Sequence, residues 1–255
     1  MLETHVHGTD TARPPILIVH GLFGSARNWG AIAKRLALAR RVISVDMRNH
    51  GASPWADSHG YDDLARDLDE VIEAHGGRAD VIGHSMGGKA AMALALTAPG
   101  RINRLVVGDI APVAYGHSQT SLVRAMQELD LTGLTTRGQA DARLAVSVPE
   151  APVRAFLLQS LDLKTDPPSW QINLDVLDRE MDRIVGWPGH DTQFTGPVLF
   201  LAGEASDYIR PEDHDTILRL FPNAEFGTVA GAGHWLHAEN PRGFLDAVTA
   251  FLDAG

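Results

Sequence analysis

Ser85 lies between two glycines in the pattern G-x-S-x-G, formed by Gly83, Ser85 and Gly87. The pattern follows the apolar run "ADVI" and precedes the alanine-rich stretch "KAAMALAL". This order predicts a tight turn between a buried strand and a helix, with the serine hydroxyl lifted clear of the sheet. Glycines two positions away on either side leave room for so sharp a turn. A serine presented in this way is typical of a nucleophile.

A serine hydroxyl is a weak nucleophile unless a base takes its proton. His234 is favoured as that base, because it lies in the glycine-rich loop "GAGHWLHAENP" between the last predicted strand and the last predicted helix. His237 could form a metal pair with His234, but no third ligand accompanies them, so a packing role is favoured. His84 is expected to point away from Ser85 and to pack. The histidines expected at the surface are His5, His7, His59, His117, His190 and His214.

A third group must orient the imidazole and stabilise its charged form. Asp109 ends the predicted strand "RLVVGDI", and Asp207 follows the predicted strand "PVLFLAGE". Both lie between Ser85 and His234 in the sequence. Either aspartate could instead serve as a turn or capping residue. From the residues alone, either Asp109 or Asp207 could be the acid.

Two backbone N–H groups are expected to hold a negative oxygen near Ser85. The Met86 N–H begins the helix that follows the serine, so the helix dipole points to the same place. The second donor is predicted in "VHGLFGS", where Gly21 lets the chain turn and the Leu22 N–H, or alternatively that of Phe23, faces Met86. The nearby loop "DMRNHGAS" contains an aspartate and an arginine that are expected to be structural.

Strands and helices alternate around these residues. The apolar runs "ILIV", "RRVISVD", "ADVIG", "INRLVVGDI", "GPVLFLAGE" and "AEFGTVAG" are predicted strands. Because most are apolar throughout, they favour an α/β fold with a mostly parallel, doubly wound sheet covered on both faces. The alternation stops in residues 112–190, which contain helical stretches and no convincing buried strand. We therefore expect a core domain of residues 1–111 and 191–255 with a helical cap of residues 112–190.

The cap contributes several large apolar side chains. Most are expected to pack in its core and a minority to line an apolar pocket. They include Phe156, Leu157, Leu158, Trp170 and Trp187.

Composition excludes several classes of protein. The 255 residues include 22 basic and 32 acidic ones, and the net charge of −10 disfavours a nucleic-acid partner. The absence of cysteine excludes disulfides, thiol nucleophiles and thiolate metal sites. No secretory signal and no bilayer-spanning segment is evident, so a cytoplasmic protein without membrane contact is expected. The oligomeric state stays open.

The motifs "HGLFGS", "DMRNHGAS", "GHSMGGKAAM", "VVGDIAP" and "GAGHWLH" occur in the order and spacing of the α/β-hydrolase family. More narrowly, the chain resembles small bacterial carboxylesterases related to mitochondrial abhydrolase-domain esterases. The resemblance implies an eight-stranded sheet, with fewer strands where the N-terminus is short, and a helical cap after the sixth strand. It also implies hydrolysis without a cofactor or metal, with Ser85 as nucleophile, His234 as base, and Leu22 and Met86 at the oxyanion hole.

The acid is where this sequence departs from the family. Many members carry an aspartate three residues after the glycine that ends the seventh strand, but here Gly203 is followed at that distance by Ser206. Asp207 comes one residue late. Members similar to this chain place the acid after the sixth strand instead, which favours Asp109, with Asp207 and then Asp175 as alternatives.

The function that the resemblance implies is hydrolysis of small carboxylic esters. We expect short to medium acyl chains and an acyl-enzyme intermediate. The alternatives are a thioesterase or lactonase with the same three residues, or a non-catalytic small-molecule receptor of the same fold. Dehalogenases and epoxide hydrolases of the family are disfavoured, because they carry a carboxylate where Ser85 stands.

Overall fold

The six apolar runs form six strands of one seven-stranded sheet in the computed structural model, which describes residues 1–254. The strand order is β1-β3-β2-β4-β5-β8-β9. Every neighbouring pair is parallel except β1 and β3, which are antiparallel. The strands are β1 (Thr4–His7), β2 (Ile16–Val19), β3 (Val42–Val45), β4 (Ala79–His84), β5 (Ile102–Gly108), β8 (Val198–Gly203) and β9 (Ala224–Val229).

Strand β1 was not predicted, because "THVH" is polar and partly exposed at the edge of the sheet. The sheet nevertheless has one strand fewer than the eight that the resemblance implies. The long insertion follows β5, the fifth strand of this chain, which takes the place of the sixth strand in the eight-stranded pattern. The class of fold, a mostly parallel α/β sheet, is confirmed.

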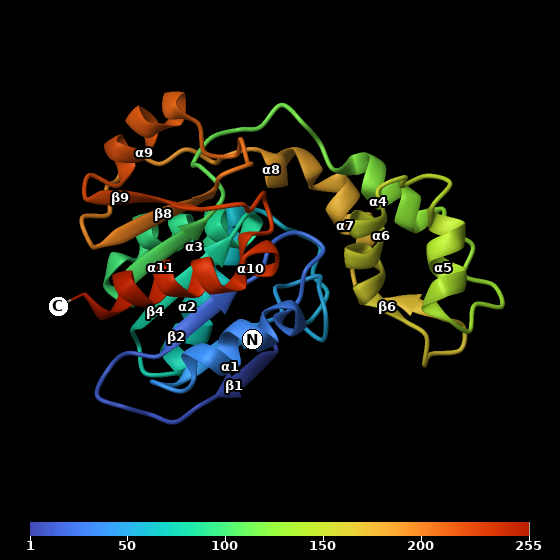
Figure 1. Ribbon diagram of the computed structural model, residues 1–255, viewed down its shortest axis with the longest axis horizontal. Helices are drawn as coiled ribbons and strands as arrows, with labels where there is room; N and C mark the ends of the chain where they lie inside the picture. The colour runs from blue at the N-terminus through green and yellow to red at the C-terminus, as the bar shows by residue number, and fades with distance from the viewer. Residues whose placement is uncertain (255) are drawn as a thin grey trace.

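Helices cover both faces of the sheet, because side chains of successive strand residues alternate between the faces. On β2, Ile16 and Ile18 pack with helices α1 (Gly30–Leu36) and α11 (Pro241–Asp253). Leu17 and Val19 pack on the opposite face with α2 (Tyr61–Ala74), α3 (Met86–Thr97) and α9 (His214–Leu220). Figure 1 shows α1 and α11 in front of the sheet and α2 and α3 behind it.

Helix α3 carries the nucleophile turn at its start and is buried around nearly its whole circumference. Its residues from Met86 to Leu96 are all buried. A helix that is apolar all round needs cover on every side, and here the sheet, α2 and neighbouring segments supply it. The turn at its N-terminus is therefore continuous with a helix that is buried from Met86 to Leu96. The remaining short helices of the core are η1 (Ala26–Trp29), η2 (Pro99–Arg101), η4 (Pro211–Asp213) and α10 (Leu236–Glu239).

Residues 112–190, here called the cap segment, lie to one side of the sheet (Figure 1). They contain α4 (Thr120–Gln127), α5 (Arg137–Leu144), α6 (Ala151–Leu157), η3 (Leu158–Ser160), α7 (Leu174–Arg179) and α8 (Met181–Val185). They also contain an antiparallel pair, β6 (Leu161–Asp162) and β7 (Ser169–Trp170), whose strands are too short to give a sequence pattern. The division into a core of residues 1–111 and 191–255 and a cap of residues 112–190 stays a prediction. In the part of the chain that the structure describes, no helix has the length and apolar character needed to cross a bilayer.

Candidate active site

The three residues considered for nucleophile, base and acid meet at one edge of the sheet. Ser85 follows β4, Asp109 follows β5, and His234 lies in the loop after β9. The backbone N–H of Ser85 donates to the Gly108 carbonyl at 2.9 Å, and that of Asp109 donates to the Leu201 carbonyl at 2.9 Å. These bonds continue the parallel ladders past the ends of the strands. They fix the two side chains at the carboxyl edge, where open α/β sheets bind their ligands.

The turn at Ser85 is as sharp as its glycines predict. Ser85 has φ of 52° and ψ of −122°, a conformation that ordinary residues rarely adopt. A Cβ atom on Gly83 would lie 2.4 Å from the Gly87 carbonyl oxygen, and one on Gly87 would lie 2.4 Å from the His20 carbonyl oxygen. Both distances are far below van der Waals contact, so only glycine fits at these two positions.

Ser85, His234 and Asp109 form a continuous hydrogen-bonded chain. The Ser85 Oγ lies 3.1 Å from His234 Nε2, and His234 Nδ1 lies 2.7 Å from Asp109 Oδ2. With an Nδ1–H that donates to the carboxylate, Nε2 is free to accept the serine proton. Asp109 is completely buried, whereas Ser85 and His234 are partly exposed toward a cavity. The arrangement suits nucleophilic attack by Ser85 with His234 as base.

Asp109 is held by two further hydrogen bonds. Its Oδ1 accepts the Gly203 N–H at 3.0 Å, and its Oδ2 accepts the Ser206 hydroxyl. Asp109 itself has φ of 51°, so the backbone turns sharply to direct the carboxylate at His234. Ser206 lies three residues after Gly203, the position where many family members carry the acid. This position was the only feature of the sequence that drew attention to Ser206. The Ser206 hydroxyl binds the Asp109 carboxylate, which also accepts from His234.

The alternative acids lie elsewhere. The Asp207 side chain is 85% exposed and pairs with Arg210 at 3.5 Å. Asp175 accepts a hydrogen bond from Gln127 within the cap segment. The structure therefore brings Asp109, and neither alternative, to His234.

The loop from Gly21 to Phe23 packs directly against the serine. A Cβ atom on Gly21 would lie 3.1 Å from the Ser85 Cβ, so the backbone approaches Ser85 as closely as a glycine permits. The Phe23 N–H donates to His50 Nε2 at 3.2 Å and is thereby engaged away from the cavity. This favours the Leu22 N–H over that of Phe23 as the second donor beside Met86.

Three buried histidines brace this loop and Met86. His20 donates from Nδ1 to the Gly21 carbonyl and accepts the Met47 N–H at Nε2. His50 holds the Phe23 N–H, and His59 Nε2 lies 3.2 Å from the Met86 Sδ. Burial lowers the pKa of all three below the ordinary value, and that of His59 to about 3. The prediction that His59 lies at the surface is wrong, because it fills the space beneath the site.

His84 and His237 have packing roles, as expected. His84 donates from Nε2 to the His234 carbonyl at 2.7 Å, so it fixes the loop that carries His234. The His237 ring stacks on Trp29 with a centroid distance of 3.9 Å. Among residues 1–254, no group of three or more His, Cys, Asp or Glu side chains has an arrangement suited to a metal ion.

The loop after β3 is structural, as its pattern predicts. Asp46 accepts the backbone N–H groups of Ala26 and Ala52 at 2.7 and 2.9 Å. Arg48 forms a two-pronged ion pair with Asp67 on α2. The aspartate and the arginine thus hold different neighbours and do not pair with each other.

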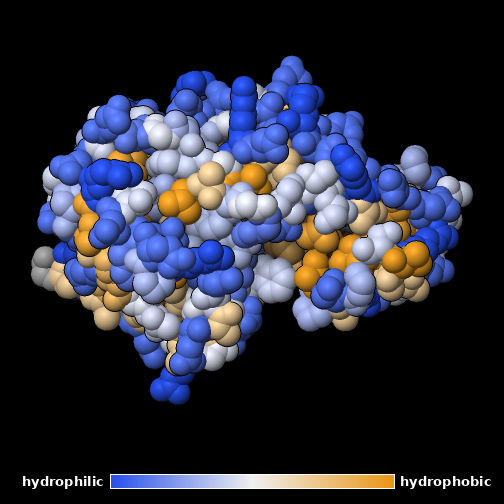
Figure 2. All heavy atoms as spheres, turned by 90° about the horizontal axis from the view of Figure 1, so that it is seen from above, coloured by the Kyte–Doolittle hydropathy of each residue, from blue (hydrophilic) through white to orange (hydrophobic). Residues whose placement is uncertain are grey.

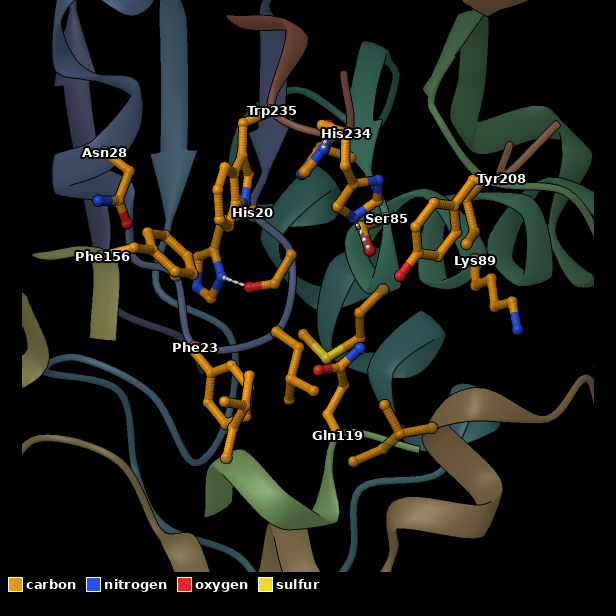
Figure 3. A pocket seen from close by; sticks show the side chains of 18 of the residues that line it. His20, Phe23, Asn28, Ser85, Lys89, Gln119, Phe156, Tyr208, His234 and Trp235 are labelled. Atoms are coloured by element: carbon orange, nitrogen blue, oxygen red, sulfur yellow. Dashed lines mark hydrogen bonds between the residues drawn. The ribbon is translucent and has the colours of Figure 1, made fainter. Parts of the chain in front are cut away.

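A largely apolar cavity of about 140 Å³ opens beside Ser85. Figure 3 shows Ser85 and His234 on one wall and Phe23 and Phe156 on another. The Tyr208 ring stacks on the His234 ring at 4.0 Å. Among the five apolar cap residues singled out in the sequence, Phe156 and Leu157 line the cavity.

The cavity is lined by residues of both the core and the cap segment. Asn28 donates to the Gln159 side chain at 2.6 Å, and the rings of Phe156 and Trp235 lie 5.5 Å apart. Figure 2 shows a notch between the larger body of the molecule and the cap segment, with apolar side chains gathered on the cap side of it. Residues of the core and of the cap segment therefore form the walls of the cavity together.

The buried histidines predict a loss of stability in acid. Burial lowers the pKa of His59 and of His237 to about 3, so both stay neutral in the folded protein while the unfolded chain takes up protons near pH 6.5. Their contribution to stability is therefore complete above pH 6.5 and is lost as the pH falls toward 3. Between pH 7 and pH 5 the free energy of unfolding should fall by about 2 kcal/mol for each histidine.

Urea unfolding midpoints measured from pH 7 to pH 5 test this expectation. His237→Phe is the matched variant, because phenylalanine can keep the stack on Trp29 and cannot titrate. Its midpoint should fall less steeply than that of the wild type. Equal slopes for the two proteins would contradict the assignment to His237.

The family model of the alpha/beta hydrolase fold matches residues 14–241, and the chain belongs to the α/β-hydrolase family. It is 41% identical over 252 residues to the Mus musculus sn-1-specific diacylglycerol lipase ABHD11, covering 95% of this chain and 82% of the lipase. It is also 41% identical over 244 residues to the Escherichia coli K12 esterase YbfF, covering 94% of this chain and 93% of the esterase.

A solved structure of a marine microorganism esterase superposes with a TM-score of 0.92 at 36% identity, covering 98% of this chain and 100% of that esterase. With these relatives, the protein is a hydrolase of the esterase and lipase type. The resemblance inferred from its motifs is confirmed.

Proposed function

We propose that this protein hydrolyses carboxylic esters with short to medium acyl chains, using Ser85, His234 and Asp109 without a cofactor or metal. The hydrogen-bonded chain from Ser85 through His234 to Asp109, placed beside an apolar cavity, carries this proposal. In the proposal, residues 112–190 act as the cap that covers the acyl chain. The small-molecule ester is the only partner that the chemistry requires.

The reaction proceeds through an acyl-enzyme. His234 takes the Ser85 proton as Oγ bonds to the acyl carbon, and Asp109 stabilises the resulting imidazolium. The Leu22 and Met86 N–H groups hold the tetrahedral oxyanion, and loss of one such donor typically raises the barrier by about 3 kcal/mol. The bond to the alcohol breaks and His234 delivers its proton to the leaving oxygen. Water then attacks the acyl-enzyme by the same route and releases the acid.

The size of the cavity supports a short acyl chain. Its volume of about 140 Å³ is close to that of an engineered protein cavity that accepts one benzene molecule, about 150 Å³. Apolar side chains dominate its walls, which favours burial of a hydrocarbon chain. The residues of this kind include Leu22, Ile110, Leu122, Val153, Phe156, Leu157, Ile184 and Val185.

A second candidate substrate is a diacylglycerol. The 41% identity to the mouse sn-1-specific diacylglycerol lipase over 95% of this chain favours it. In this candidate the second acyl chain would leave the cavity between the core and cap residues that line it. A thioester or a lactone would use the same three residues.

The p-nitrophenyl esters of acetate, butyrate, octanoate and palmitate test the proposal, together with a dioleoylglycerol, an acyl-coenzyme A and a simple lactone. We expect the highest kcat/KM for butyrate or octanoate, with a burst of p-nitrophenol equal to one acyl group per chain if deacylation is slow. Faster turnover of palmitate or of the diacylglycerol would assign the protein to long-chain lipids. A stable serine adduct without turnover would favour the receptor over the esterase.

A further inference from the structure

Lys89 is a buried cation that the proposed mechanism does not use. It lies one helical turn after Ser85 on α3 and is only 1% exposed. In the described part of the chain, no carboxylate lies within ion-pair distance of its ammonium group. Lysine is rarely buried completely without such a partner, because its charge loses the solvation of water. A methionine of similar length would fill the same space without that cost.

The ammonium group holds the end of α8. Its Nζ donates to the carbonyls of Val185 and Gly186 at 3.0 and 2.6 Å. It also lies over the faces of two aromatic rings, 4.7 Å from the centroid of Tyr115 and 5.7 Å from that of Tyr61. Charge-assisted hydrogen bonds and cation–π contacts are the interactions that make a buried ammonium tolerable.

Lys89, Tyr61 and Tyr115 together form what we call the α8 socket. The Tyr61 hydroxyl donates to the Ile184 carbonyl at 2.5 Å, and the Tyr115 backbone N–H donates to the Val185 carbonyl at 3.0 Å. With the two bonds from Lys89, three successive carbonyls at the end of α8 are bound. Two of the groups that bind them come from α2 and α3 of the core, so the socket fastens the end of the cap segment to the nucleophile helix.

The α8 socket is also a wall of the cavity. Ile184 and Val185 line the same cavity as Ser85, and so do the three residues of the socket. Figure 3 shows the Lys89 side chain directed away from Ser85, so its amine is not placed to exchange a proton with the nucleophile. Its influence on the reaction must therefore pass through the wall that it holds.

We propose that Lys89 is a positioning residue that seats the end of α8 against the nucleophile helix and thereby limits the length of acyl chain that the cavity accepts. The inference rests on the proposed ester hydrolysis at Ser85. A merely structural lysine would affect stability alone, whereas Lys89 is expected to affect KM and the preference for chain length.

The socket is also sensitive to pH near neutrality. Burial lowers the pKa of Lys89 to about 7, and it raises the pKa of Tyr61 and of Tyr115 far above the ordinary value, so the two phenols stay neutral. The charged residues on α8 itself, Asp182 and Arg183, are exposed, and among the contacts of the described residues neither is paired with Lys89. His117 contacts Tyr115, but no hydrogen bond joins it to the Lys89 amine. Loss of the Lys89 proton weakens its bonds to the carbonyls, since charge-assisted bonds are about twice as strong as neutral ones.

Lys89→Met tests the inference, with Lys34→Met, at an exposed position of α1, as the control for a lost charge. For p-nitrophenyl butyrate we expect a rise in KM of about tenfold with kcat within about twofold, and a rise of similar size in the ratio of octanoate to butyrate turnover. In the wild type the KM for butyrate should rise between about pH 6 and pH 8.5, and in Lys89→Met it should not. Lys89→Arg keeps a charged donor at every pH and should recover part of the low KM without the pH dependence.

The outcomes separate the two proposals. A folded Lys89→Met with unchanged KM, chain-length preference and pH dependence overturns the role of Lys89, and so does a loss confined to kcat. If Lys89→Met does not fold, Tyr61→Phe removes only the hydroxyl bound to Ile184, and a smaller rise in KM for butyrate is expected; no change overturns the inference. Absence of ester turnover by the wild type would instead mean that the proposed function has failed.

Discussion

Ser85→Ala is expected to lower kcat for p-nitrophenyl butyrate by about 10⁶-fold, the loss seen when the nucleophile of a serine hydrolase is removed. The Ser85 hydroxyl is the only group at the turn that reaches His234 Nε2, at 3.1 Å. Without it no acyl-enzyme can form, and the remaining donors and the cavity can only bind the ester. The measurement is kcat with the chromogenic ester, supported by labelling with a fluorophosphonate, which reacts with an activated serine.

The folded state of this variant should be intact. Alanine has about the same backbone cost as serine at a φ of 52°, and among the described residues the one hydrogen bond of the removed hydroxyl is with His234. The thermal melt of Ser85→Ala should therefore match that of the wild type, and the fluorophosphonate should not label it. If the variant is folded and is not labelled, residual turnover above about 1% of the wild-type kcat would place the nucleophile elsewhere.

Asp109→Asn is expected to lower kcat by about 10⁴-fold, whereas Asp207→Asn should leave it nearly unchanged. An asparagine at 109 can place its NH₂ group against His234 Nδ1, which favours the tautomer with the proton on Nε2 and removes the acceptor that Ser85 needs. Asp207 is exposed and pairs with Arg210, so its charge is screened from the site. The measurement is kcat for both variants with matched thermal melts.

Ser206 supplies a sharper control for the acid. Its hydroxyl already touches Asp109 Oδ2, the same oxygen that receives His234 Nδ1. An aspartate at 206, in the Asp109→Asn background, should reach His234 and recover about tenfold of the lost activity, a gain worth one charge-assisted hydrogen bond. A large loss in Asp207→Asn with Asp109→Asn unaffected would move the acid to the seventh strand of the family pattern.

Most of the sheet could be predicted, because a buried parallel strand leaves a continuous apolar run in the sequence. The strand Thr4–His7 could not, since an edge strand with one exposed face has no such run. The pair β6 and β7 is too short to have a period. Both exceptions depend on pairing with distant segments, which local composition does not record.

In the candidate site too, the sequence indicated some residues, whereas contacts between distant loops could not be predicted. Ser85 and His234 were indicated by the glycines and loops around them. Asp109 and Asp207 were both indicated by their places after predicted strands, and only the resemblance favoured Asp109. The bond from Ser206 to Asp109 and the stack of Tyr208 on His234 join loops that are far apart in the sequence. The burial of His59 was missed for a related reason: its polarity predicts exposure, and only the packed loop beneath Met86 reveals that it is enclosed.

Phe23, Ser85 and Asp109 each have a positive φ, between 51° and 63°, and each stands at a different corner of the site. Such backbones cost about 1–3 kcal/mol each in residues other than glycine. The packing and hydrogen bonds of the rest of the fold must therefore offset the free-energy cost of these strained backbones. Selection for thermal stability alone would therefore favour glycine at position 85, and the lineages that carry it would be more stable and would lack the proposed nucleophile.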